Sequence, residues 1–265
     1  MSRMQGVFSE LKEKNQKAFV AYITAGDPNL DATQEICNAL SQSGVDVIEL
    51  GVPFSDPLAD GPTNQKASER ALASGTNLSS ILSTVKKLRD SGLETPIVLF
   101  SYLNPIYAMG YESFAEECKR VGVDGALVLD LPPEEAGQYI EVMRRQNIDT
   151  VFLASPTTTE NRLKLINQES RGFVYYVSRT GVTGVQSDVS DTLDSEVSKV
   201  RALVSKPLII GFGISNPEQA KQIGSLGDGI VIGSAIVKMV ENYHNDIKTI
   251  DKISDFVNGV SESLK

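Results

Sequence analysis

The sequence predicts a closed (β/α)₈ barrel, because eight short apolar runs alternate with helical patterns over 265 residues. The runs are continuously apolar and rich in β-branched and aromatic residues, as expected of parallel strands that are buried on both faces. Eight strand–helix units in a chain of this length favour a closed barrel over an open doubly wound sheet. The predicted strands are FVAYIT (19–24), VDVIEL (45–50), PIVLFSY (96–102), GALVLD (125–130), TVFLAS (150–155), FVYYVS (173–178), PLIIGF (207–212) and DGIVIG (228–233).

Helical patterns fill the segments between these strands. Asp31 precedes an apolar face, and the stretch 78–88 repeats apolar residues at helical spacing. The prolines and glutamates at 132–135 are expected to open the helix after the fourth strand. Asn216 before Pro217 is a typical helix start, with proline in the first turn. The remaining helices are expected around residues 114–118, 163–166 and 193–204.

Three further helical patterns fall outside the alternating units. They cover residues 3–14, residues 65–73 after the second strand, and residues 250–264 near the C-terminus. The sequence contains no recognisable interdomain linker or low-complexity segment. We therefore predict a single domain, residues 1–265, with the TIM-barrel architecture and these three helices as additions.

The composition indicates a soluble globular protein, with 41% hydrophobic and 22% charged residues. The net charge of −9 supplies no basic face, which argues against nucleic acid or an anionic membrane as a partner. A bound phosphate is therefore expected to be held by backbone N–H groups. The polar start of the chain and the lack of a long apolar run predict a cytoplasmic protein without a signal peptide or membrane span. Cys37 and Cys118 lie far from any Cys-x-x-Cys spacing and are expected to be reduced thiols.

A glutamate stands at the end of the second predicted strand, in the stretch IELGVPFSDPLADGP (48–62). Active sites of such barrels lie at the carboxyl ends of the strands. By strand alternation Glu49 shares a face with Val45 and Val47, and if that face is the barrel interior, its carboxylate stands among apolar groups. Desolvation would then raise its pKa toward neutrality, which suits a group that donates and accepts a proton. The alternative is a glutamate that only caps a loop or pairs with a lysine.

Further carboxylates occupy the predicted loops. Asp56 and Asp60 follow the second strand, where an Asx turn is the default interpretation, and Asp27 and Asp130 are equally ambiguous. Several carboxylates above a barrel can bind Mg²⁺, although no two of these are closely spaced, and we assign no metal site. The only histidine, His244, lies in or just beyond a late helix, so carboxylates are expected to carry any proton transfer.

Glycine-rich loops follow the last three strands. GFGISNPEQ (211–219) follows the seventh strand, and the eighth ends in GSAIV (233–237). Glycines let the backbone approach an anion, Ser234 offers a hydroxyl at a helix start, and barrels commonly bind phosphate in these two loops. SRTGVTGVQSD (178–188), after the sixth strand, is a candidate lid over the same site. Together the loops predict a phosphorylated ligand.

Five stretches, in their order and spacing, resemble the tryptophan synthase alpha subunit over nearly the whole chain. They are AYITAGDP, IELGVPFSDPLADGPT, YLNPIYAMG, YYVSRTGVTG and GFGIS with GSAIV. The resemblance implies retro-aldol cleavage of indole-3-glycerol phosphate to indole and glyceraldehyde 3-phosphate. It also implies that the alpha subunit uses no cofactor, since pyridoxal phosphate belongs to the beta subunit.

Under this resemblance, Glu49 would be the general acid–base that protonates the departing indole carbon and accepts the proton of the glycerol hydroxyl. Asp60 would accept a hydrogen bond from the indole N–H and stabilise the positive charge that develops on that nitrogen. Thr183 would meet Asp60, and Tyr175 would line the site near Glu49. The expected phosphate contacts are Gly184, Gly213, Gly233 and Ser234. The residues expected to enclose the indole ring are Tyr22, Phe100, Leu127, Phe212 and Val231. The alternative is that these five apolar residues only fill the barrel core.

The resemblance further implies a beta-subunit partner in an α₂β₂ complex, which orders the loops of the alpha chain. The expected docking surface includes Pro53, Phe54 and Asp56 on one loop and the segment from Asn104 to Tyr107. Beside the pocket, Asn64, Phe100 and Leu129 depart from the residues usual in the family.

Two other functions stay open at this point. One is a weakly active chain that mainly activates its partner, which the departures beside the pocket would favour. The other is a different phosphate-binding barrel enzyme, such as a sugar-phosphate isomerase or a Mg²⁺-dependent prenyltransferase. Release of indole by the chain would argue against a weakly active chain that mainly activates its partner. Loss of activity in a chelator would favour a Mg²⁺-dependent enzyme.

Overall fold

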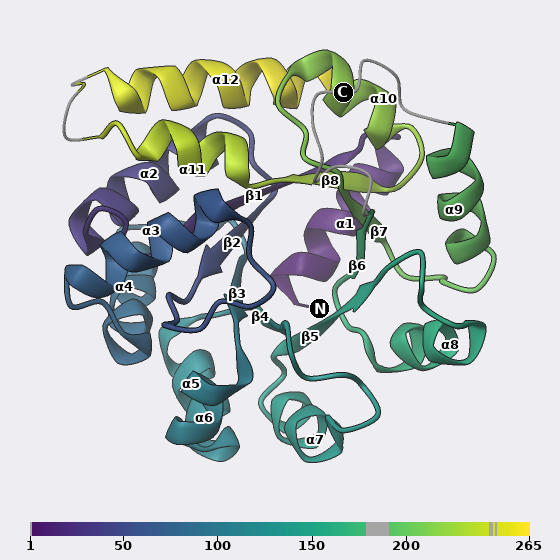
Figure 1. The fold of residues 1–265 in the computed structure, drawn as a ribbon, viewed down its shortest axis with the longest axis horizontal. Coiled ribbons are helices and arrows are strands. Elements are labelled where there is room, and N and C mark those ends of the chain that lie inside the picture. Colours follow the sequence, from purple (N-terminus) through teal and green to yellow (C-terminus); the bar gives the residue numbers. More distant parts are fainter. Residues whose placement is uncertain (1, 179–190, 244–245, 247) are drawn as a thin grey trace.

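The fold is given by a computed structural model, which describes residues 2–178, 191–243, 246 and 248–265. Its parallel strands pair in sequence order and close into a barrel, with β8 beside β1 (Figure 1). The predicted TIM-barrel fold is therefore confirmed. The strands are β1 (Ala18–Thr24), β2 (Val47–Gly51), β3 (Ile97–Ser101), β4 (Gly125–Val128), β5 (Asp149–Ala154), β6 (Val174–Val177), β7 (Leu208–Gly211) and β8 (Gly229–Ile232).

Helices surround the barrel in the described part of the chain, and none of them is long and apolar enough to cross a membrane. The three predicted additions are present as α1, α3 and α12. The helices are α1 (Arg3–Glu13), α2 (Leu30–Gln42), α3 (Pro62–Ala73), α4 (Leu78–Asp90), α5 (Leu103–Met109), α6 (Tyr111–Val121), α7 (Gly137–Arg145), α8 (Glu160–Glu169), α9 (Asp191–Arg201), α10 (Pro217–Gly224), α11 (Ser234–Val240) and α12 (Thr249–Ser263).

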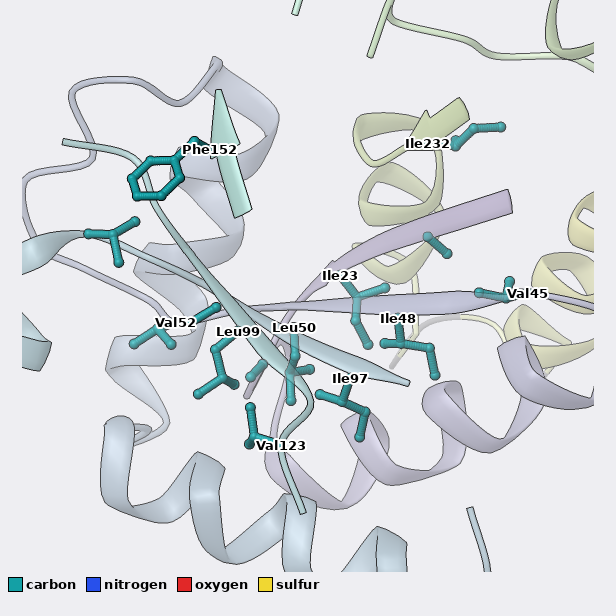
Figure 2. Packing of buried hydrophobic residues seen from close by; sticks show 14 of the residues in the cluster. Ile23, Val45, Ile48, Leu50, Val52, Ile97, Leu99, Val123, Phe152 and Ile232 are labelled. Atoms are coloured by element: carbon teal, nitrogen blue, oxygen red, sulfur yellow. The ribbon is translucent and has the colours of Figure 1, made fainter. Parts of the chain in front are cut away.

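The strand side chains alternate between two hydrophobic clusters. Val47 belongs to the cluster inside the barrel, whereas Ile48 and Leu50 belong to the cluster between the barrel and its helices. Figure 2 shows part of this outer cluster, where Leu50 lies beside Leu99 of the neighbouring strand. Because Glu49 stands between Ile48 and Leu50 in the sequence, the alternation turns its side chain into the barrel interior.

The first and last helices occupy different places on the barrel. In Figure 1, α1 lies within the ring of strands and α12 lies outside α11 and α2. Met4 of α1 is fully buried in the interior cluster, and a Cβ on Gly125 or Gly172 would lie 2.8 Å from its Cε. These two glycines therefore make room for the α1 side chain that fills this end of the barrel. That residues 1–265 form one domain stays a prediction, which this packing of both terminal helices supports.

Two local predictions are wrong, and one helix was not predicted. Val45 does not share the interior face with Glu49, because it precedes β2 and its N–H bonds the carbonyl of Leu40 at the end of α2. The stretch 132–135 forms turns ahead of α7 rather than its first turn. The segment 103–109 is helical as α5, although no helix was predicted there.

Candidate active site

Glu49 stands in the barrel interior near the end of β2, with Tyr22 and Val98 as its register partners on β1 and β3. Its side chain is completely buried, and neither carboxyl oxygen has a hydrogen-bond partner among the described residues. Ionisation there would remove a charge from water without compensation, so burial raises the pKa of Glu49 from 4.5 to about 8. A loop-capping or lysine-paired glutamate does not fit this environment.

Two tyrosines lie close enough to Glu49 for its charge to affect them. Tyr22 is its neighbour across the β1–β2 register, and the Tyr22 hydroxyl lies 3.3 Å from Oγ1 of Thr24. Burial raises the pKa of Tyr175 well above 10, and the Glu49 and Asp60 charges add to the increase. Burial likewise raises the pKa of Tyr22, with further contributions from Asp60 and Glu49. Both tyrosines are therefore neutral hydroxyls at physiological pH, and both sense the two carboxyls.

Asp60 lies in the loop between β2 and α3, where Tyr102 holds its carboxyl group. Tyr102 directly follows β3, and its hydroxyl donates to Oδ2 of Asp60 over 2.9 Å while it accepts a hydrogen bond from the Ala59 N–H. Burial raises the pKa of Asp60, and the side chains of Tyr102 and Asn64 oppose that increase. Tyr102 was not predicted from the sequence, because a contact between residues 42 positions apart leaves no signal in local spacing.

A cleft of about 700 Å³ opens beside Asp60 at the carboxyl ends of β3 to β6. Its volume is in the range of pockets for small ligands. The predicted site residues Asp60, Phe100 and Tyr175 line it, as do Asn64 and Leu129, which were expected beside the pocket. Leu153 and Val177, which were not expected, line it too. The alternation of β5 and β6 was a signal that could have identified Leu153 and Val177.

The other predicted ring contacts lie around or below this cleft. Tyr22, Leu127 and Val231 belong to the interior cluster, and the rings of Tyr22 and Phe100 meet edge to face at 5.0 Å between centroids. Gly51 allows this arrangement, because a Cβ there would lie 2.5 Å from the Tyr22 hydroxyl. Phe212 differs from the other four, since it is partly buried against the outer cluster.

The predicted phosphate contacts follow two adjacent strands. The pairing of Gly211 with Val231 aligns the ends of β7 and β8, so the loops that follow emerge at the same edge of the barrel. Gly213 has a φ of +68°, which favours glycine, and Ser234 is exposed as the first residue of α11. Gly233, the cap residue of α11, has no side chain to occupy the first-turn N–H groups. Thr183 and Gly184 lie outside the described residues, as does His244.

The remaining loop carboxylates have structural partners. Asp27 is buried and bonded by Nε and Nη2 of Arg70, both at 2.8 Å. Asp130 accepts a hydrogen bond from the Leu103 N–H, and Asp56 accepts one from the Ser55 hydroxyl. Within the described ranges, no three acidic, histidine or cysteine side chains group closely enough to hold a metal ion.

The surface predicted to meet a partner combines exposed and supporting residues. Asp56 and Asn104 are exposed, and Tyr107 is 69% exposed. The ring centroids of Phe54 and Tyr102 lie 5.3 Å apart, and Pro53 of the same loop is buried. Leu58, which the sequence analysis did not single out, is 94% exposed on the same loop. A large apolar side chain exposed to water suggests a contact with another protein. The exposure of Leu58 is visible only in the structure.

A family, two relatives and a solved structure that resemble this chain carry the same description. The family described as Tryptophan synthase alpha chain matches residues 8–265. A tryptophan synthase alpha chain from Pelobacter propionicus is 48% identical over 264 residues, which cover 100% of this chain and 98% of the relative. One from Geobacter sulfurreducens is 47% identical over 264 residues, which cover 100% of this chain and 99% of that relative. The solved tryptophan synthase alpha subunit of Legionella pneumophila superposes with a TM-score of 0.93 at 36% identity, covering 100% of this chain and 98% of that one.

Proposed function

The chain belongs to the tryptophan synthase alpha chain family, which cleaves indole-3-glycerol phosphate, and we propose that Glu49 and Asp60 divide the chemistry of that cleavage. As an alpha chain it is a carbon–carbon lyase of tryptophan biosynthesis. It uses no cofactor, since pyridoxal phosphate belongs to the beta subunit. The observation that carries the proposal is the buried and unpartnered carboxyl group of Glu49.

Glu49 acts as both acid and base in this proposal. With a pKa of about 8, it is largely protonated at neutral pH and can donate a proton to the ring carbon that bears the glycerol chain. The resulting carboxylate then takes the proton of the hydroxyl on the adjacent chain carbon. The carbon–carbon bond breaks, its electron pair returns to the ring, and the hydroxyl-bearing carbon becomes the aldehyde of glyceraldehyde 3-phosphate.

Asp60 stabilises the intermediate stage of this sequence. Protonation of the ring carbon leaves a positive charge on the ring nitrogen, and an ionised carboxylate that accepts the ring N–H lowers the energy of that cation. The hydrogen bond from Tyr102 supports this role, because it orients the carboxyl group and opposes the effect of burial on its pKa. Thr183 is proposed to approach Asp60, and Tyr175 to bound the site beside Glu49.

The substrate is proposed to lie with its ring inside the barrel mouth and its phosphate at the β7–β8 edge. The ring would contact Tyr22, Phe100, Leu127, Phe212 and Val231. The phosphate would accept hydrogen bonds from the backbone at Gly184, Gly213 and Gly233 and from the Ser234 hydroxyl. The glycine φ at 213 and the exposed serine at the start of α11 support this placement.

The family implies a beta-subunit partner, and we propose an α₂β₂ complex that uses the loop at 53–58 and the segment 104–107. The exposed Leu58 and Tyr107 support this surface, because large apolar side chains in contact with water mark interaction sites. We further propose that the complex works in the cytoplasm. Cys37 and Cys118 are free and buried thiols, which suits a reducing compartment.

Indole release from indole-3-glycerol phosphate, with and without a beta subunit, tests the proposal. We expect measurable release by the chain alone and faster release in the complex, with no loss of activity in a chelator. Failure to release indole above background, even with excess beta subunit, would show that the chain only activates its partner.

A further inference from the structure

Asn64 carries a polar atom that the proposed reaction does not explain. Its Oδ1 is buried and lacks a hydrogen-bond partner in the described part of the chain. The residue lies in the first turn of α3, directly after the Asp60 loop, and it lines the cleft together with Asp60. Buried carbonyl oxygens are nearly always paired in folded proteins, and exceptions gather where a ligand supplies the missing partner.

The neighbouring carboxylate determines how the Asn64 amide is oriented. Ionised Asp60 can only accept hydrogen bonds, and Asn64 lowers the pKa of Asp60 as a donor does. The Nδ2 group must therefore face Asp60, which leaves Oδ1 without a role in that contact. Other nearby donors are already engaged, since Tyr102 bonds Oδ2 of Asp60 and Gln65 Nε2 bonds the Asp60 carbonyl, both at 2.9 Å.

We propose that Asn64 is a specificity-determining residue whose Oδ1 accepts, beside Asp60, the N–H of the bound indole ring. This inference rests on the proposed function of the cleft and of Asp60. The ring N–H is the only polar hydrogen of indole, so any hydrogen bond that Oδ1 makes with the ring must use it. The two acceptors, Asp60 and Asn64 on the same side of the cleft, then select a bicyclic ring with a donor over one without.

Competitive inhibition of the cleavage reaction by indole and by benzofuran tests this selection. Benzofuran has the same shape but carries a ring oxygen in place of the N–H. We expect wild type to prefer indole, and Asn64→Leu to reduce that preference about 3- to 10-fold, the loss of one hydrogen bond. Lys66→Gln, at an exposed position of the same helix, is the matched control and should leave the preference unchanged.

Asn64→Asp gives a second readout that does not depend on the leucine variant folding. It keeps the shape of the side chain but replaces the donor that faces Asp60 by an acceptor with negative charge. The pKa of Asp60 should rise, and the acid limb of the kcat/KM profile should move to higher pH.

An unchanged indole preference in Asn64→Leu, or an unchanged acid limb in Asn64→Asp, overturns this inference while leaving the roles of Glu49 and Asp60 intact. Failure of the proposed function has a different signature, which is normal turnover after Glu49→Gln.

Discussion

Glu49 illustrates at the level of one residue how a buried carboxyl group without a partner lowers the stability of the fold that holds it. In the unfolded chain its pKa is near 4.5, whereas in the folded protein it is about 8. Between these values the folded protein binds more protons than the unfolded chain, so the free energy of unfolding falls as pH rises. This loss in the free energy of unfolding is absent below pH 4.5 and complete above about pH 8, where it amounts to roughly 5 kcal/mol.

Glu49→Gln should therefore stabilise the protein at alkaline pH. Glutamine has a similar shape and no charge to desolvate, so its advantage should grow between about pH 4.5 and 8 and then level off. Urea denaturation of both proteins across this range measures the difference in the free energy of unfolding. A difference that does not change with pH would contradict the buried, raised-pKa state of Glu49.

From the sequence, strand alternation offered a buried Glu49 as one of two interpretations, but it could not supply every neighbour. The prediction that Val45 shares the face of Glu49 is wrong because alternation applies only within a strand, and β2 begins at Val47. Tyr102 and Asn64 act on Asp60 through loop geometry, which the order of residues does not encode locally. The role of Tyr102 became visible only when β2 and β3 were paired in space.

At the level of elements, α3 is the helix that anchors the Asp60 loop. It begins at Pro62, two residues after Asp60, and Arg70 near its end bonds the buried Asp27 of the β1–α2 loop. Arg70 also reaches Glu241 beyond α11. An ion pair with one fully buried partner is costly to break, because removal of the cation leaves a carboxylate without compensation.

Arg70→Met should lower the free energy of unfolding by about 3 kcal/mol. It should also reduce turnover, since the helix behind Asp60 loses its attachment. The double variant Asp27→Asn with Arg70→Met should recover much of the stability, because it removes the unpaired charge. Arg120→Met, which breaks the exposed pair with Glu117, is the control and should cost less than about 1 kcal/mol. Equal stabilities of the single and double variants would contradict this account.

The two helices that were missed or misplaced from the sequence, α5 and α7, have weak local sequence signals. α5 is only seven residues long and contains Pro105, so its pattern resembles a loop. Asp130 favours its first turn by accepting the Leu103 N–H, a contact across 27 positions. At α7, the consecutive prolines suggested a helix start, but the chain makes turns before the helix begins at Gly137.

On the scale of the whole molecule, barrel closure brings distant segments to one rim. The loop after β2 carries the exposed Leu58 and holds Asp60. The segment after β3 begins with Tyr102 and continues into α5, which carries the exposed Tyr107. A partner that covers Leu58 would thus press on the segment that positions Asp60. This arrangement offers a physical route by which assembly would change catalysis, through a loop shared by the proposed docking surface and the proposed active site.

Leu58→Asp should weaken binding to the beta subunit by at least about 10-fold, because a charge would replace an apolar contact on the proposed docking surface. The protein itself should fold normally, since this side chain is 94% exposed. Leu72→Asp, at a partly exposed leucine outside the proposed surface, serves as the comparison and should bind normally. Titration calorimetry with purified beta subunit measures both affinities, and equal affinities would exclude Leu58 from the interface.

The central claim is that the dry carboxyl of Glu49 transfers the protons of the reaction. Turnover of Glu49→Gln in complex with the beta subunit tests it most directly, alongside binding of an unreactive substrate analogue that lacks the chain hydroxyls. The account predicts a loss of about 10²- to 10⁴-fold in indole release with binding of the analogue retained. Turnover close to that of wild type would contradict it.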